Sequence, residues 1–356
     1  MSPIPRRVLL YALLTTAAIL RSQTSVPADF ASRADRLCSG FVEQKKFMGS
    51  VLVARAGKPL FRKSYGFANA EWDVANTPDT KFRLGSITKQ FTATAILQLV
   101  EQGKLRLDDP ISKYYADAPK TWEKVTIHNL LNHTSGIPSY TGIPNFFGTG
   151  SKLPLTPAQI VKLTQDKPLE FEPGAKFAYD NTGYILLGYV IEKITGKPYA
   201  GYLRQAIFDP LGMKDTGYDV YEAILKHRAS GYSMSGASMI NSPYLDMTLP
   251  YAAGSLYSTV DDLSTWDRAL YTDKVLTADS RKKMFTPGLS NYGYGWFIDQ
   301  RFNRSHMEHG GGINGFNTVI SRYPGDKVLV VVLSNLNSNI VEKIGTGLAA
   351  LLFGEP

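Results

Sequence analysis

Residues 82–93 read Phe-Arg-Leu-Gly-Ser-Ile-Thr-Lys-Gln-Phe-Thr-Ala and place a serine and a lysine three positions apart. The pattern predicts that a loop becomes a helix here, so Ser86 and Lys89 would share one helix face, about 5–6 Å apart at Cβ. A lysine amine in this position can accept the seryl proton once burial or neighbouring positive charge lowers its pKa. Ser86 would also lie near the positive end of the helix dipole. The segment therefore predicts an activated serine nucleophile.

The pair is not specific by itself, because serine is also a favoured N-cap of ordinary helices. A second motif supports the catalytic interpretation. Tyr179-Asp180-Asn181 follows the turn at Pro173-Gly174 and precedes an expected helix. A tyrosine hydroxyl can relay a proton, and an asparagine amide can donate and accept hydrogen bonds. In isolation, the same tripeptide also fits a turn with a packed aromatic side chain.

A run of glycines forms the third motif, His309-Gly310-Gly311-Gly312, which we expect to lead into a strand. Glycine lets backbone N–H groups approach a ligand closely, so the run predicts an oxyanion hole for a bound acyl group. A phosphate-binding loop is the alternative, but the sequence contains no G-x-x-x-x-G-K-[ST] motif to support it. The absence of G-x-S-x-G argues against an α/β-hydrolase esterase.

In this order, Ser-x-x-Lys, Tyr-x-Asn and His-x-Gly resemble the motifs of the serine β-lactamase and penicillin-binding-protein superfamily. The chain is similar to the branch that contains class C β-lactamases, D-alanyl-D-alanine carboxypeptidases and β-lactamase-like carboxylesterases. The resemblance covers roughly residues 35–354. Four further stretches agree with it, namely residues 130–138, 179–188, 253–263 and 294–296.

The resemblance implies three catalytic residues and no metal or cofactor. Ser86 would be the nucleophile that becomes acylated, with its backbone N–H in the oxyanion hole. Lys89 would accept the seryl proton. Tyr179 would assist proton transfer to the leaving group. The implied reaction passes through a covalent acyl-enzyme, which divides one difficult displacement into two easier steps.

The implied binding residues are Asn181, His309, Gly311 and Gly312, with the Gly312 N–H in the oxyanion hole and Asn181 orienting Lys89 or the substrate. His309 departs from the family pattern, since many members have a Lys-Thr-Gly motif here. An imidazole with a pKa near 6.5 is only partly charged at neutral pH. Gly310 also lacks the hydroxyl of the motif's threonine. These departures favour esters, amides or peptides over efficient β-lactam hydrolysis.

We therefore expect a serine hydrolase of the carboxylesterase or D-stereospecific peptidase type, with at most weak β-lactamase activity. The alternatives are a class C-like β-lactamase or D-alanyl-D-alanine carboxypeptidase, and a non-catalytic homologue that binds ligands. The expected partner is a small-molecule or peptide acyl donor, with peptidoglycan fragments as one source. The net charge of +8 includes no dense Lys/Arg block, which argues against nucleic acid. Loops at residues 139–153 and 227–250 would shape the cleft.

The N-terminus has the pattern of an export signal. Arg6 and Arg7 precede the apolar residues 8–20, and Val26-Pro27-Ala28 offers a cleavage site. We expect residues 1–28 to be a signal peptide and the mature protein to be bacterial, periplasmic or secreted, without stable membrane insertion. A retained anchor is the alternative, although the apolar run is shorter than the roughly 20 residues that span a bilayer.

Residues 29–356 are expected to form a single α+β domain of the β-lactamase/transpeptidase-like fold. Strands are predicted at residues 49–55, 60–66, 294–299, 316–323 and 328–334, and terminal helices at residues 30–46 and 340–353. One antiparallel sheet would be closed by both chain ends and flanked by the terminal helices. About residues 29–106 and 251–356 would form the α/β part. About residues 107–250 would form an all-α region, with the active site between the two.

The remaining reactive side chains are expected to have structural roles. Cys38 is the only cysteine and lies in an amphipathic segment, which predicts a small core residue. His128 and His133 lack the H-E-x-x-H spacing of a zinc protease. We expect His133 to join a helix end to the next loop, and His227 and His306 to lie on the surface.

Overall fold

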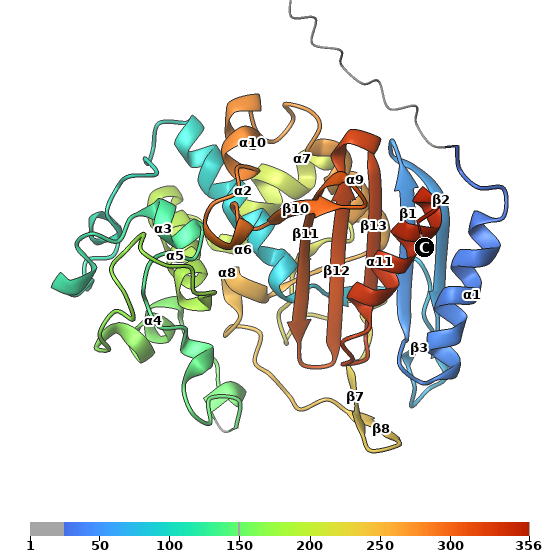
Figure 1. The fold of residues 1–356 in the computed structure, drawn as a ribbon. Coiled ribbons are helices and arrows are strands. Elements are labelled where there is room, and N and C mark those ends of the chain that lie inside the picture. Colours follow the sequence, from blue (N-terminus) through green and yellow to red (C-terminus); the bar gives the residue numbers. More distant parts are fainter. Residues whose placement is uncertain (1–24, 149, 356) are drawn as a thin grey trace, which may run out of the picture.

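The computed structural model describes residues 25–148 and 150–355 (Figure 1). Most of the expected signal peptide lies outside these residues. The main sheet has six antiparallel strands in the order β10-β11-β12-β13-β1-β2. In that order the strands are Phe297–Arg301, Arg304–Ile313, Phe316–Tyr323, Val328–Ser334, Gly49–Arg55 and Lys58–Tyr65. Because β1 pairs with β13, both ends of the chain build the sheet, as the sequence predicts.

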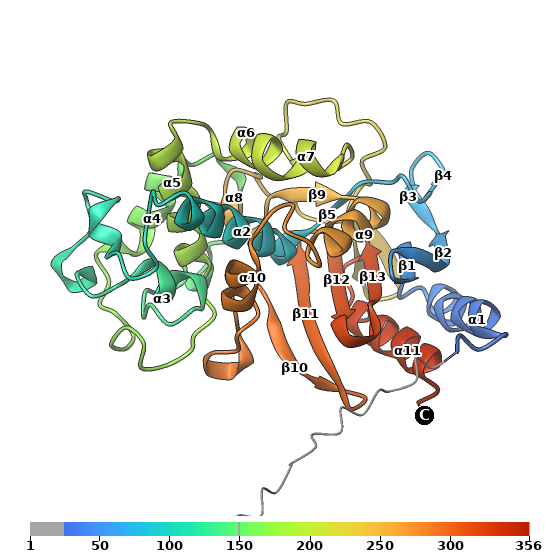
Figure 2. The same ribbon diagram turned by 90° about the horizontal axis from the view of Figure 1, so that it is seen from above.

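Helices cover both faces of the sheet. The terminal helices α1 (Phe30–Glu43) and α11 (Val341–Phe353) contact each other on one face, and α9 (Val260–Ala269) packs on the other (Figure 2). Alternate residues of β13 enter the two cores: Val330 packs with the terminal helices, and Val331 packs on the opposite side. A strand buried on both faces is continuously apolar, which explains why β13 could be predicted from its sequence. Cys38 lies in the terminal-helix core, as expected.

The region between the two sheet-forming segments is mainly helical. Three of its helices, α3, α4 and α5, begin at side-chain caps. Thr126 and Thr156 form capping boxes for α3 and α4, and the Asp180 carboxylate accepts the Gly183 N–H at the start of α5. The helices are α3 (Ile127–Leu131), α4 (Pro157–Gln165), α5 (Asn181–Thr195), α6 (Tyr199–Leu203) and α7 (Asp209–Leu211).

The expectation that this region is all-α is wrong in two places. Strand β6 (Gly217–Tyr218) pairs with β9 (Leu256–Ser258), which also pairs with β5 (Phe82–Arg83). A hairpin is formed by β7 (Tyr232–Ser235) and β8 (Ser238–Asn241). Its residues are largely exposed and serine-rich, so they lack the apolar alternation by which a half-buried strand is predicted. The remaining short elements are β3 (Phe67–Asn69), β4 (Val74–Ala75), α8 (Tyr251–Gly254) and α10 (Ala278–Met284).

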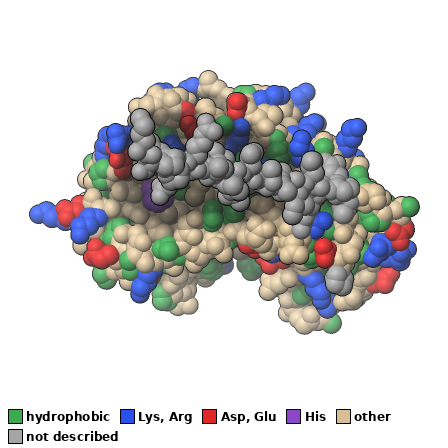
Figure 3. Space-filling view, turned by 45° about the horizontal axis from the view of Figure 1, so that its top comes forward, with side chains coloured by type: hydrophobic (Ala, Val, Ile, Leu, Met, Phe, Trp, Pro, Cys, Tyr) green, Lys and Arg blue, Asp and Glu red, His purple; other side chains and the backbone are tan. Residues whose placement is uncertain are grey.

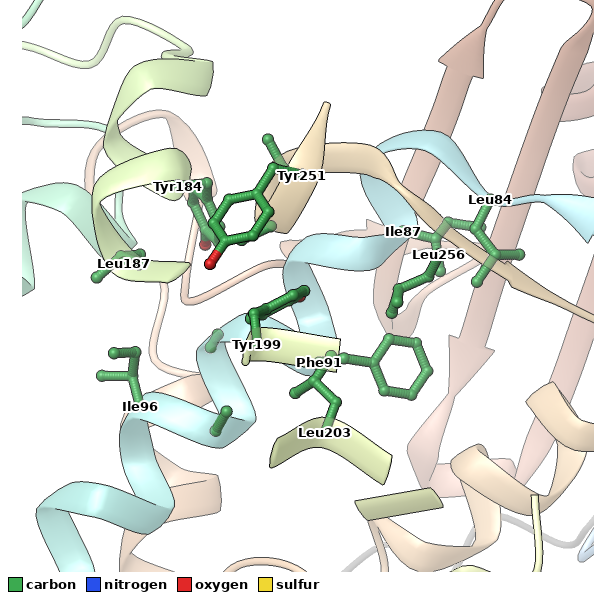
Figure 4. Close-up of a cluster of buried hydrophobic side chains, with 14 of the residues drawn as sticks. Leu84, Ile87, Phe91, Ile96, Tyr184, Leu187, Tyr199, Leu203, Tyr251 and Leu256 are labelled. Atoms are coloured by element: carbon green, nitrogen blue, oxygen red, sulfur yellow. The ribbon is translucent and has the colours of Figure 1, made fainter. Parts of the chain in front are cut away.

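Helix α2 (Thr88–Glu101) lies between the sheet and the helical region (Figure 2). Nearly all its side chains are buried, which is typical of a helix surrounded by protein. In Figure 4, Phe91 and Ile96 of α2 lie among side chains of α5 and α6, including Leu187 and Leu203. The helix that carries the serine–lysine pair is therefore held from several sides. No helix in the described part of the chain is long and apolar enough to span a bilayer.

Candidate active site

Ser86 lies in a short 3-10 turn, Gly85–Ile87, immediately before α2. Gly85 has a φ of +56°, in the left-handed region that glycine adopts without strain. A Cβ on Gly85 would lie 2.9 Å from the backbone nitrogen of Gly312. The glycine before the serine therefore lets strand β11 approach the nucleophile closely.

Lys89 is fully buried and its ammonium contacts three oxygen atoms. The Nζ atom lies 3.2 Å from Ser86 Oγ, 2.8 Å from Asn181 Oδ1 and 2.9 Å from the Ala253 carbonyl oxygen. The amide and carbonyl oxygens can only accept hydrogen bonds. A neutral Lys89 amine therefore donates its two N–H groups to them and directs its lone pair at the Ser86 hydroxyl. The structure brings the predicted serine, lysine and asparagine together in this arrangement.

Burial lowers the pKa of Lys89 from its ordinary 10.5 to about 7, because the charged ammonium loses its hydration. The nearby Asp180 carboxylate acts in the opposite direction and offsets part of this decrease. The Tyr179 and Tyr184 ring centroids lie 4.8 and 5.4 Å from Nζ. Near neutral pH, a substantial fraction of Lys89 is therefore neutral and able to accept a proton.

The Tyr179 hydroxyl is buried, and Tyr179 and Ser86 line the same cavity. Among the residues that the structure describes, no atom has both the distance and the angles of a hydrogen bond to this hydroxyl. Burial raises its pKa above the ordinary value of 10, and the Ser86 hydroxyl offsets part of this increase. The phenol is therefore protonated at neutral pH. The Tyr179 ring packs on the His133 imidazole, with the two ring centroids 4.3 Å apart. This O–H beside the nucleophile is therefore available to a substrate atom.

His309 is neutral, which corrects the expectation of a partial positive charge. Its Nδ1 atom is 2.6 Å from the Gly310 carbonyl oxygen, an acceptor, so Nδ1 carries the proton. Its Nε2 atom, 3.0 Å from the Tyr292 hydroxyl, accepts that O–H. Burial, together with the smaller effect of the Lys89 charge, lowers the pKa of His309 to about 3. The motif thus supplies no fixed cation where a lysine would have done so.

The other histidines have structural environments. His133 is buried with a φ of +59°, and its Nδ1 accepts the backbone N–H of Asp180, so it joins the end of α3 to the loop before α5 as expected. His227 lies on the surface beside Asp79. The expectation of a surface position for His306 is wrong: it is 1% exposed, and hydrogen-bonds to Asp299 and Ser321. A side chain on β11 that faces the packed side of the sheet is buried whatever its polarity.

The glycine run lies within β11 itself, although the sequence suggested that it precedes a strand. Strand β10 pairs with β11 only as far as Glu308, so residues 309–313 face the Ser86 turn on that side. A Cβ on Gly311 would lie 2.0 Å from the Leu84 carbonyl oxygen, which accepts the Thr318 hydroxyl at 2.7 Å. Only glycine fits this contact, which brings the Gly312 backbone next to Ser86.

Two cavities meet at Ser86 and Gly312, and we name them the loop arm and the strand arm. The loop arm, about 480 Å³, is lined partly by residues of the two loops that the sequence predicted to shape the cleft, including Tyr140, Phe146, Phe147, Leu245 and Leu249. The lining of the strand arm, about 600 Å³, includes Tyr179 and the residues of the His309 motif. It also includes polar side chains that no sequence motif marked, namely Asn317, Thr318, Asn339 and Glu342.

Comparisons with known proteins agree with this architecture. Residues 34–354 match the family model described as Beta-lactamase. The putative penicillin-binding protein PbpX of Bacillus subtilis is 34% identical over 304 residues, which cover 85% of this chain and 74% of that protein. The octameric penicillin-binding protein homologue from Pyrococcus abyssi is 31% identical, with a TM-score of 0.81 and coverage of 91% of this chain and 77% of that one.

A D-stereospecific amidohydrolase from Streptomyces sp. is also similar, with 27% identity, a TM-score of 0.78 and coverage of 91% of this chain and 98% of that one. The family match and the 34% identical relative each extend over most of the chain described above. The fold likewise matches these neighbours over nine tenths of the chain. The chain therefore belongs to the Beta-lactamase family.

Proposed function

We propose that this protein is a serine hydrolase that cleaves an ester or amide bond through an acyl-enzyme on Ser86. The observation that carries the proposal is the geometry of Lys89. A buried amine with a pKa of about 7 is held 3.2 Å from the seryl oxygen, and its two N–H groups have acceptors elsewhere. An amine of this kind serves as a general base near the pH at which it titrates.

The proposed reaction uses only side chains and backbone groups of the chain. Ser86 Oγ bonds to the acyl carbon while its proton passes to neutral Lys89, and the acyl oxygen accepts the N–H groups of Ser86 and Gly312. The bond to the leaving group breaks, and that group takes the proton, delivered through the Tyr179 hydroxyl. A water molecule then adds to the acyl carbon, loses a proton to the same groups and releases the acid and Ser86.

The proposed substrates are esters, amides or peptides rather than β-lactams. Neutral His309 offers no fixed cation for the carboxylate that β-lactams and peptidoglycan stems carry. The similarity to a D-stereospecific amidohydrolase supports an amide or peptide substrate. A β-lactamase or D-alanyl-D-alanine carboxypeptidase activity remains the alternative. A panel of p-nitrophenyl esters, D-amino acid amides, D-Ala-D-Ala peptides and nitrocefin separates these, and we expect the esters to be turned over fastest.

We also propose that the protein is exported and acts on small-molecule or peptide acyl donors, not on nucleic acid. The N-terminal pattern of residues 1–28 and the similarity to a penicillin-binding protein support export. Among the described side chains on the face drawn in Figure 3, lysine and arginine are mixed with acidic residues and form no continuous basic track for a phosphate backbone. Fractionation of cells that express the full chain tests the location.

The decisive experiment is mass spectrometry of intact protein after incubation with a fluorophosphonate or a reactive ester. We expect the wild-type mass to rise by one adduct, and Ser86→Ala to gain none and to lose about 10³-fold or more in turnover. Ser32→Ala, an exposed serine on α1, is the matched control and should behave as wild type. Labelling of Ser86→Ala would refute the assignment, and a wild type that accepts no acyl donor would indicate a binding homologue.

A further inference from the structure

The two arms of the cleft can be assigned to the two halves of a substrate, if the proposed function holds. Both arms contain Ser86 and Gly312, so the reacting carbonyl lies where they meet. The proton donor for the leaving group, Tyr179, lines the strand arm and not the loop arm. The leaving group therefore departs into the strand arm, and the acyl group occupies the loop arm.

The arms differ in charge. Among the described residues that line them, Glu342 at the start of α11 is the only one with a formal charge, since burial keeps His309 neutral. The loop arm contains apolar and uncharged polar side chains only. The cleft therefore has one carboxylate, and it lies in the arm that receives the leaving group.

Gly310 gives the cleft access to this carboxylate. A Cβ at position 310 would lie 3.2 Å from Glu342 Oε1, so any side chain there would stand against the carboxylate. Along β11, Gly310 is two residues from Gly312, a distance of about 7 Å. A group bound by Glu342 is therefore separated from the reacting carbonyl by a short linker of a few atoms.

We propose that the strand arm selects leaving groups that carry a positive charge, with Glu342 as the residue that recognises it. The preferred substrate is an ester or amide with an uncharged, largely apolar acyl group and an alcohol or amine that bears an ammonium a few atoms from the scissile bond. On cleavage, the linking atom takes the proton that Ser86 gave to Lys89, and the ammonium leaves unchanged. An anionic leaving group is disfavoured in the same arm.

A purely structural role for Glu342 makes a different prediction. A carboxylate in the first turn of a helix is stabilised by the helix dipole. No ion pair within residues 25–148 and 150–355 involves Glu342, and Arg301, which lines a neighbouring cavity together with Glu342, is paired with Glu308. If Glu342 only stabilised the helix through its dipole, removing the Glu342 carboxylate would lower the stability of the protein. It would not change the preference between charged and neutral substrates.

The test compares butyrylcholine with 3,3-dimethylbutyl butyrate, its neutral isostere, and with the butyrate ester of 4-hydroxybutanoate. The ratio of kcat/KM values is measured for wild type, Glu342→Gln and Asp279→Asn at low and high salt. Asp279 lies in the first turn of α10, outside both arms. Asp279→Asn is the matched control, because it also removes a carboxylate from the start of a helix. Gly310→Ala, whose backbone φ suits alanine, tests access to the carboxylate.

We expect wild type to favour the cationic ester over its isostere by about fivefold or more at low salt, and less at high salt. The ratio should approach one in Glu342→Gln, decrease in Gly310→Ala and remain unchanged in Asp279→Asn. Equal ratios in wild type and Glu342→Gln, or no wild-type preference, would overturn the inference while the hydrolase assignment stands. If wild type neither cleaves p-nitrophenyl butyrate nor forms an adduct, the proposed function fails and the inference fails with it.

Discussion

Lys89 and His309 lie in one buried region, and burial disfavours the charged form of both side chains. The two residues nevertheless differ in what they can do. The pKa of Lys89 falls to about 7, so the amine changes charge within the physiological range. The pKa of His309 falls to about 3, so the imidazole stays neutral there. Between pH 5 and 9, Lys89 is therefore the member of this pair that changes its protonation state.

The first prediction concerns the pH dependence of catalysis. The kcat/KM value for a neutral ester should rise with pH through about 7, as Lys89 loses its proton. Lys89→Arg keeps a positive charge that cannot be released, so it should lose several orders of magnitude at every pH. Circular dichroism checks its fold, and Lys89→Met provides a second, uncharged variant. Near-normal activity of Lys89→Arg would exclude lysine as the base.

The lowered pKa of Lys89 also makes the stability of the folded protein depend on pH. Folded Lys89 loses its proton at about pH 7, but the unfolded chain keeps it up to 10.5. Between these values the unfolded state binds more protons, so the free energy of unfolding rises with pH across this window. Below pH 7 the unfavourable burial of charge is fully present. In urea titrations, the stability of wild type relative to Lys89→Met should therefore increase from pH 7 to pH 10.

The second prediction concerns His309, the other candidate base. His309→Gln retains an oxygen that can accept the Tyr292 hydroxyl, so the local hydrogen bonding survives. We expect a loss of about tenfold or less in kcat/KM and no shift of the rise near pH 7, because a neutral imidazole does not titrate there. The pH–rate profile is the measurement. An inactive His309→Gln combined with an active Lys89→Arg would reverse the roles given to the two residues.

At the scale of elements, the site depends on the contact between β11 and the Ser86 turn. The third prediction is that Gly311→Ala breaks this contact, because its Cβ would lie 2.0 Å from the Leu84 carbonyl oxygen and 2.4 Å from Thr318 Oγ1. We expect a loss of about 1–3 kcal/mol in stability and a decrease in kcat, since the Gly312 N–H moves away from Ser86. Gly325→Ala, in an exposed turn with no atom near its Cβ, is the control and should change neither.

The same elements show what a sequence can and cannot reveal. Strand β13 is continuously apolar and could be predicted, whereas β11 contains charged residues and glycines and is a strand only because two neighbours pair with it. Ser86 and Lys89 could be found because the helix repeat joins them locally. Glu342 reaches the cleft and Tyr292 reaches His309 from distant segments, and nothing in the sequence around either residue marks it. Their places depend on tertiary packing.

At the scale of the whole molecule, buried polar links connect the layers. Arg322 on β12 donates from Nε to Asp267 on α9 at 2.8 Å, and both side chains are buried. Trp266, also on α9, donates to Gln90 on α2 at 3.1 Å. The sheet, α9 and the helix that follows the nucleophile are thereby joined in one series of contacts. A change in the sheet can therefore alter the position of α2.

The fourth prediction tests this connection. Arg322→Ala leaves the Asp267 carboxylate buried without its partner, which should reduce stability by about 3–5 kcal/mol. Arg62→Ala removes a cation from a pair with Asp261 in which both side chains are more than 40% exposed, and should cost about 1 kcal/mol or less. Urea denaturation of the two variants provides the comparison. Equal effects would show that the buried pair has no special role in holding α9 on the sheet.

The pairing of β1 with β13 also has a consequence for how the chain folds during synthesis. Val51 of β1 pairs with Val332 of β13. The ribosome therefore synthesises the hairpin of β1 and β2 long before it synthesises β13, the strand that pairs with β1. At roughly 5–20 residues per second, ribosomes need tens of seconds to supply that strand. Throughout this interval β1 lacks its partner strand β13, and its apolar side chains are not yet buried in the finished sheet. The complete sheet therefore cannot form until β13 has been synthesised. A chain with such a non-local pairing folds late and relies on protection of its first strands until then.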